Sequence, residues 1–207
     1  MARRRTHAPL RVLLNNRLVG QLSKASTGAI EFQYDLQWLE WEHALPVSLS
    51  LPLREDVYRG EVVAAVFENL LPDSDVLKRR VAERVGAAGT DAYSLLAAIG
   101  RDCIGAMQFM AGDSADEEDA TTIKGEPLTG AAIETLLRGL SQSPLGLSRE
   151  EAFRISVAGA QEKTALLRHK GRWWKPAGTT PTTHIFKKQI GRLPNGLDLS
   201  DSVENEF

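Results

Sequence analysis

The chain has 207 residues, of which 43% are hydrophobic and 25% are charged, as in ordinary globular proteins. Its formal net charge of −2 gives no global signal for nucleic-acid binding, and its single cysteine, Cys103, excludes an internal disulfide and agrees with a reducing cytoplasm. No apolar run approaches the roughly 20 residues of a membrane span, and no apolar signal core follows the basic residues 1–9, which we interpret as a solvated tail.

Three strands are predicted near the start of the chain. Leu10–Leu14 and Arg17–Leu22 flank the dipeptide Asn15-Asn16. Because asparagine tolerates a positive φ, this pattern predicts a tight β-hairpin. A third strand is expected at Ala29–Tyr34.

Helices are predicted next. Glu61–Leu71 carries apolar residues at helical spacing and ends at Pro72. Asp73 or Ser74 then caps a second helix. The outer face of this helix is basic, which indicates a solvated face or a contact with DNA or an acidic partner; its cations are Lys78, Arg79, Arg80 and Arg84.

The remaining elements favour an α+β fold, because strands and helices do not alternate as in βαβ units. Asp91 is expected to cap a third helix, followed by Gly100 in the left-handed conformation. Ile104–Met110 is predicted to be a strand, and Thr129 to cap the helix Gly130–Leu140. We place one subdomain at residues 10–140 and a second at 148–207. The acidic residues 113–119 between two of these elements are interpreted as a surface loop, without a metal site.

The chemistry of the chain is concentrated after residue 155. Ser156–Lys163 is a β-like approach followed by a loop of small residues, and an apolar β-like run continues from it. Such loops let backbone amides approach phosphates, while a lysine adds positive charge. Gly159 is the only glycine, so neither the Walker pattern nor the glycine-rich kinase pattern is met, and spacing alone favours an ordinary turn between strands. A second lysine, Lys187, ends the β-like run that begins at Thr182, and alternation places the neighbouring Lys188 on the opposite face.

These residues occur in strings that closely resemble those of HipA-type toxin kinases, the serine/threonine kinases of bacterial type II toxin–antitoxin modules. The resemblance covers nearly the whole chain from about Leu10, and its strings follow the family's order. The matching stretches are 46–53, 68–74, 99–102, 156–167, 180–185 and 197–200.

The resemblance implies an ATP site with Mg²⁺. It assigns ATP contacts to Lys187 and to the loop residues Ala158, Gly159, Ala160, Gln161, Glu162 and Lys163. It also implies that Ser156 is autophosphorylated, which displaces the loop and switches the kinase off. We expect a carboxylate to hold Lys187: Glu206 is the candidate, Glu204 its rival, and a solvated acid in the first turn of a helix is an equal alternative.

The implied protein phosphorylates a translation component, glutamate–tRNA ligase in the family, and is neutralised by a HipB-like helix-turn-helix antitoxin bound to operator DNA. A cytoplasmic location follows. On this interpretation the chain holds the amino-terminal subdomain and the start of a kinase-like N-lobe. No H-x-D-x-x-x-x-N string occurs, so we expect the catalytic Asp and the metal ligands beyond Phe207, and no activity from residues 1–207 alone. The alternative is a non-catalytic interaction module that binds the antitoxin or complements a separate kinase lobe.

Overall fold

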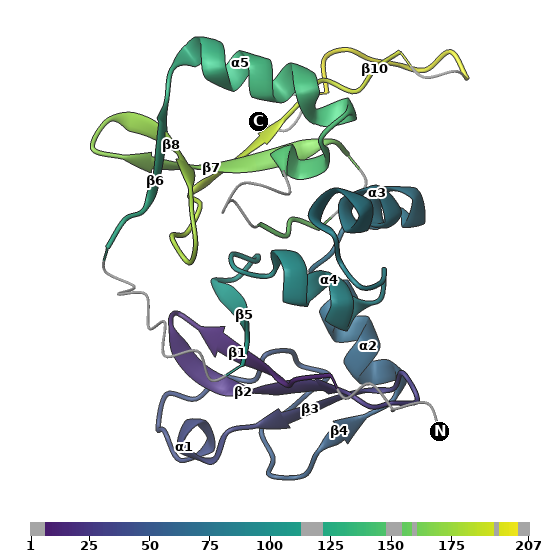
Figure 1. The fold of residues 1–207 in the computed structure, drawn as a ribbon, viewed down its shortest axis with the longest axis vertical. Coiled ribbons are helices and arrows are strands. Elements are labelled where there is room, and N and C mark those ends of the chain that lie inside the picture. Colours follow the sequence, from purple (N-terminus) through teal and green to yellow (C-terminus); the bar gives the residue numbers. More distant parts are fainter. Residues whose placement is uncertain (1–6, 113–121, 148–154, 159–160, 193–194, 203–207) are drawn as a thin grey trace.

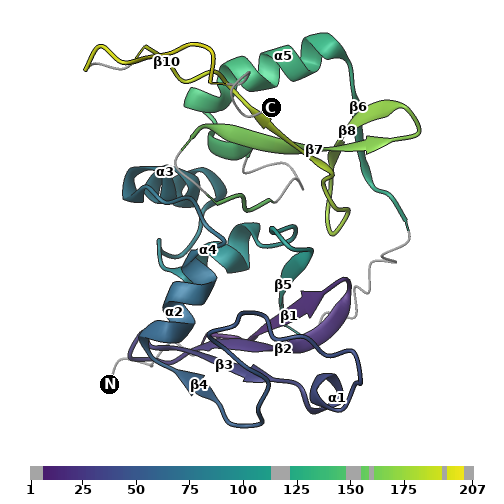
Figure 2. The same cartoon turned by 180° about the vertical axis from the view of Figure 1, so that it is seen from behind.

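The computed structural model describes residues 7–112, 122–147, 155–158, 161–192 and 195–202. Two antiparallel sheets lie at opposite ends of the molecule, and the helices α2, α3 and α4 lie toward the region between them (Figure 1). Seen from behind, the same separation holds, with α5 on the far side of the second sheet (Figure 2). The mixed α+β fold predicted from the sequence is confirmed.

The first sheet has the strand order β4-β3-β2-β1-β5. Its strands are β1 (Leu10–Leu14), β2 (Arg17–Lys24), β3 (Ile30–Tyr34), β4 (Tyr58–Arg59) and β5 (Met107–Ala111). The predicted hairpin between β1 and β2 is confirmed, because Asn15 and Asn16 have φ values of 49° and 63°. The helices of this part are α1 (Leu36–Leu39), α2 (Glu61–Glu68), α3 (Asp75–Val85) and α4 (Ala92–Ile99).

Helix starts follow the predicted caps. The side chain of Ser74 accepts from the Leu77 amide at the start of α3, and the Asp91 carboxylate accepts from the Ser94 amide at the start of α4. The predicted left-handed conformation of Gly100 is wrong, since its φ is −76°. Glycine is needed there for space: a Cβ would lie 2.5 Å from the Leu96 carbonyl oxygen and 2.9 Å from the Phe109 ring.

The second sheet has the order β6-β8-β7-β9. Its strands are β6 (Gly125–Leu128), β7 (Lys163–His169), β8 (Arg172–Pro176) and β9 (His184–Lys187); β10 (Gly191–Arg192) and β11 (Asp198–Leu199) form a separate ribbon. Helix α5 (Gly130–Arg138), capped by Thr129 as predicted, leads into the 3₁₀ turns η1 (Gly139–Ser141) and η2 (Pro144–Gly146). Because β6 pairs with β8, the sheets divide the chain before β6, earlier than the subdomain boundary we placed at residues 140–148.

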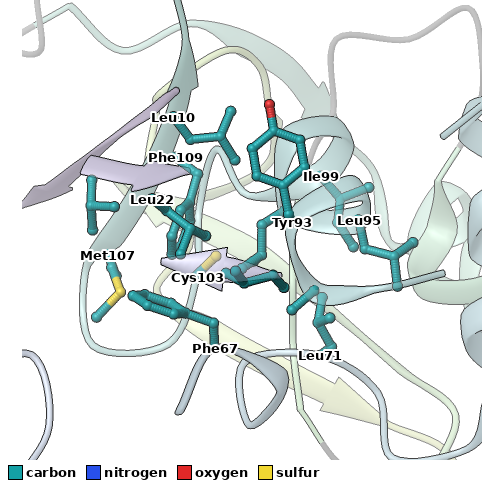
Figure 3. Close-up of a cluster of buried hydrophobic side chains, with 14 of the residues drawn as sticks. Leu10, Leu22, Phe67, Leu71, Tyr93, Leu95, Ile99, Cys103, Met107 and Phe109 are labelled. Atoms are coloured by element: carbon teal, nitrogen blue, oxygen red, sulfur yellow. The ribbon is translucent and has the colours of Figure 1, made fainter. Parts of the chain in front are cut away.

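One hydrophobic core serves both parts of the molecule. Side chains from β1, β2, β5, α2 and α4 converge in it, with Phe67 and Phe109 fully buried (Figure 3). Leu145, Leu147 and Ile155, which come from the later part of the chain, belong to the same cluster. Ala165 of β7 also belongs to this cluster, so the second sheet is packed against the first part by apolar contact. Within the described ranges no helix is long and apolar enough to cross a membrane.

Asp91 links α4 to the first sheet, and its removal should destabilise the fold in a pH-dependent way. Its carboxylate caps α4 and lies 2.7 Å from the Lys24 ammonium. Burial works to raise the Asp91 pKa, but the hydrogen bonds from Lys24 and Ser94 outweigh it, so the pKa lies below its usual range. A lowered pKa means that the stabilisation is present above the ordinary carboxyl pKa and is lost as pH falls through the folded value.

We expect Asp91→Ala to lower the free energy of unfolding by about 1–2 kcal/mol at pH 7, and by much less near pH 2. Urea unfolding at both pH values measures this difference. Asp91→Asn is the control, because it keeps a capping oxygen and should lose less. A loss of equal size at both pH values would contradict this account.

Candidate functional site

The pairing of β7 with β9 brings together the two lysines singled out in the sequence. Lys163 is directly opposite Lys187 in the antiparallel register. Side chains of directly opposed residues lie on the same face of a sheet. Lys163 is buried and Lys187 is exposed, so the two cations of this pair differ in their access to solvent.

Alternation along the paired strands β7 and β9 defines the two faces of the sheet. Ile185 lies opposite Ala165, so it shares the face of the lysines, as the alternation in the sequence predicts. On the other face the Trp173 ring contacts His184 and Phe186, each with centroids 5.0 Å apart. Trp173 therefore packs against β9 on the face opposite the lysine pair.

The loop before β7 is fastened at three points. The Lys163 ammonium donates to the carbonyl oxygen of Ala158, which closes the loop on itself. The Gln161 side-chain amide donates to the carbonyl oxygen of Lys188, and the Glu162 carboxylate lies 3.4 Å from the Lys188 ammonium. The side chains of Gln161 and Glu162 thus hold the loop to the segment that carries Lys187.

Ser156 lies inside the molecule, at the contact between its two parts. Its side chain is fully buried, and its hydroxyl donates to the Leu70 carbonyl oxygen at 2.5 Å. Its amide donates to the Asp102 carbonyl oxygen at 2.9 Å, in a parallel bridge beside Cys103. A phosphate on Ser156 would need this segment to leave its place, because a dianion has no room or solvation there.

Asp102 also forms hydrogen bonds with the segment that leads into β9. Its carboxylate accepts from the Thr182 amide at 2.8 Å and from the Thr182 hydroxyl at 2.6 Å. Burial raises the Asp102 pKa, and the two Thr182 hydrogen bonds oppose that rise only in part. The group is 9% exposed and acts as a junction between α4, the Ser156 segment and the approach to β9.

The basic face of α3 is partly engaged inside the molecule. Arg84 donates to the Leu147 carbonyl oxygen at 3.1 Å and to the Ser143 hydroxyl at 2.9 Å, and Arg80 donates to the Ser141 carbonyl oxygen. Two of the four cations that we interpreted as a solvated or partner-binding face therefore hold the 3₁₀ turns against α3.

Several predicted residues lie outside the described part of the chain. These are Gly159 and Ala160 of the loop and both acids proposed to hold Lys187, Glu204 and Glu206; the acidic residues 113–119 also lie there. Among the described residues, no group of three histidine, cysteine or acidic side chains is arranged to hold a metal ion. Burial raises the pKa of Cys103 well above its usual range, so this thiol is not a reactive nucleophile.

The contributions of Asp102 and Arg84 to this site were not predicted from the sequence. Asp102 is an acid next to the apolar dipeptide Cys103-Ile104, and an acid that enters an apolar run is a signal for a paired buried carboxylate. Arg84 carried no such signal, because its partners are carbonyl and hydroxyl oxygens in turns far along the chain.

Comparison with known proteins gives the family. The family model of the HipA N-terminal domain matches residues 10–110. A putative kinase, Y4mE of Sinorhizobium fredii, is 35% identical over 200 residues, which are 95% of this chain and 46% of that protein. Residues 10–110 are a HipA N-terminal domain, and the chain as a whole is similar to the amino-terminal part of HipA-type proteins.

Two further similarities support this assignment. The serine/threonine-protein kinase toxin HipA of Shewanella oneidensis is 27% identical over 182 residues, covering 86% of this chain and 39% of that protein. A solved structure of the Shewanella oneidensis HipA, HipB and operator DNA complex contains a chain that matches with a TM-score of 0.61 and 26% identity, over 86% of this chain and 41% of that one. The chain thus spans less than half the length of the relatives it matches.

Proposed function

We propose that this chain is the amino-terminal part of a serine/threonine kinase toxin that uses ATP and Mg²⁺ to phosphorylate a translation component. In the HipA-type family that component is glutamate–tRNA ligase. The observation that carries the ATP part of the proposal is the register of β7 and β9, which sets Lys163 opposite Lys187. Like charges directly opposite each other on a sheet destabilise it, whereas a polyphosphate between or above them turns the repulsion into attraction.

The loop supplies the second part of the proposed site. Its small residues Ala158, Gly159 and Ala160 allow backbone amides to approach phosphate oxygens. Gln161 and Glu162 hold the loop beside Lys188, so the Glu162 carboxylate is neutralised in part before an anion arrives. Lys163 secures the loop through Ala158 and adds positive charge, and Lys187 presents its ammonium at the surface.

ATP and Mg²⁺ fit the described residues to different extents. The lysine pair and the small-residue loop are suited to the ATP phosphates, whose terminal phosphoryl group is the one transferred. Within the described residues nothing gathers carboxylates for a metal, so the Mg²⁺ ligands and the catalytic Asp are proposed to lie in the part of the relatives that this chain does not span. Glu206 is proposed to hold Lys187 once that part is in place.

The proposed partners are a HipB-like helix-turn-helix antitoxin and, through it, operator DNA. The support is the similarity to a HipA chain from a structure that contains HipB and operator DNA. A cytoplasmic location goes with such a complex. Direct DNA contact by α3 is not part of the proposal, because Arg80 and Arg84 are engaged within the chain.

Replacing the lysines should weaken ATP binding. Each of Lys163→Met and Lys187→Met keeps the aliphatic stem but removes a cation from the phosphates, and we expect the dissociation constant of Mg-ATP to rise by about tenfold or more in the full-length protein. Isothermal titration calorimetry measures it.

Lys170→Asn is the matched control for these two variants. Lys170 lies at the β7–β8 turn with a φ of 46°, a conformation that asparagine tolerates, so the charge is removed without strain. Its Mg-ATP affinity should equal that of the wild type. Unchanged affinity in Lys187→Met, whose side chain is exposed, would contradict the proposed site.

Ser156 is proposed to be the regulatory phosphorylation site. Incubation of the full-length kinase with Mg-ATP should place a phosphate on Ser156, detected by peptide mass spectrometry, and should increase amide exchange around Leu70 because the Ser156–Leu70 hydrogen bond is lost. Ser156→Ala should remove the phosphate signal. An active kinase that leaves Ser156 unmodified would refute this role.

A further inference from the structure

Asp102 belongs to the first part of the molecule, yet it contacts both segments that carry the proposed ATP site. Its backbone carbonyl oxygen accepts from the Ser156 amide, two residues before Ala158. Its carboxylate accepts from the amide and hydroxyl of Thr182, which lies just before β9 and its Lys187. One buried residue therefore fixes the entrance to the loop and the entrance to β9.

The hydrogen bonds between Asp102 and Thr182 resist displacement of the segment before β9. Asp102 is 9% exposed, so loss of the two Thr182 donors would leave a largely buried carboxylate with unmet acceptors. Charge-assisted hydrogen bonds such as these are shorter and stronger than neutral ones. A displacement of the Thr182 segment is therefore costly.

A second tether fixes the same segment. The Gln108 side-chain amide, from β5 of the first sheet, donates to the Thr179 carbonyl oxygen at 3.1 Å. The Thr180 hydroxyl, which is buried, accepts from the Lys124 amide at 2.9 Å. Thr179, Thr180 and Thr182 in the approach to β9 are thus held by Gln108, Lys124 and Asp102. Among the described contacts, Asp102 is the one of these three partners that also binds the Ser156 segment.

We propose that Asp102 is a positioning residue that sets the loop and β9 in the relation that places Lys163 opposite Lys187. The inference rests on the proposed ATP site and deepens it. The HipA N-terminal domain, which matches residues 10–110, then contributes to nucleotide binding without touching the nucleotide.

The test compares Asp102→Ala with Asp102→Asn in the full-length protein. Alanine removes both Thr182 contacts, whereas the asparagine carboxamide oxygen can accept both hydrogen bonds. We expect Asp102→Ala to weaken Mg-ATP binding about tenfold and to lose amide protection over residues 182–187, and Asp102→Asn to remain within about threefold of wild type with protection retained. Mg-ATP titration and hydrogen exchange measure the two effects.

Two controls separate positioning from general loss of stability. Asp91→Ala destabilises the same part of the molecule at a carboxylate that does not contact Thr182 or Ser156 in the described structure, so it should leave Mg-ATP affinity and exchange over residues 182–187 unchanged. Thr182→Val removes only the hydroxyl contact and retains the amide. If Asp102→Ala fails to fold, Thr182→Val carries the test, with an expected loss of affinity of about threefold.

The outcomes distinguish the two proposals. If wild-type protein binds Mg-ATP through Lys187 but neither Asp102→Ala nor Thr182→Val changes affinity or exchange, the positioning role is overturned. It is also overturned if Asp102→Asn loses as much as Asp102→Ala. If wild-type protein does not bind Mg-ATP, the proposed function fails, and the exchange measurement alone then decides whether Asp102 holds the approach to β9.

Discussion

A buried carboxylate joins the two parts of this molecule. Moving an isolated carboxylate from water into a protein interior costs several kcal/mol, so such groups persist only where donors are arranged around them. The Asp102 carboxylate accepts hydrogen bonds from the amide and hydroxyl of Thr182, and the Asp102 backbone carbonyl oxygen accepts one from the Ser156 amide. The hydrogen bonds run across the contact between the first part and the second sheet, where displacement of either part would leave polar groups unpaired.

Packing and electrostatics support the same arrangement. The apolar core continues from the first sheet to Leu145, Leu147 and Ile155. Beside it, Arg84 donates hydrogen bonds to the Leu147 carbonyl oxygen and the Ser143 hydroxyl. These contacts fix the position of β9 relative to β7. A slip of the register by one residue would move Lys187 to the face of the sheet that Trp173 covers. The paired lysines are thus a consequence of tertiary structure as much as of local sequence.

Local chemistry made much of the fold predictable from the sequence. Asn15-Asn16 predicted the hairpin, and Ser74, Asp91 and Thr129 predicted helix starts, because each of these effects acts within a few residues. The pairing of β6 with β8 could not be predicted, since it joins segments separated by α5 and the whole of β7. Gly100 illustrates the same limit: its position after a helix indicated a left-handed cap, but the close approach of Phe109 from β5 determines the requirement for glycine.

The residues of the candidate site could be named from the sequence, but the contacts that hold them in place could not. Alternation correctly placed Lys187 with Ile185, while family resemblance, not spacing, distinguished the loop from an ordinary turn. The role of Asp102 depends on Thr182 and Ser156, which are distant in sequence and meet only in the folded chain.

The most direct test of the central claim is a crystal structure of the full-length protein with Mg²⁺ and a non-hydrolysable ATP analogue. The account predicts phosphate oxygens within hydrogen-bond distance of the Lys187 ammonium and the loop amides of residues 158–163. A nucleotide bound elsewhere, with Lys187 facing solvent, would contradict it.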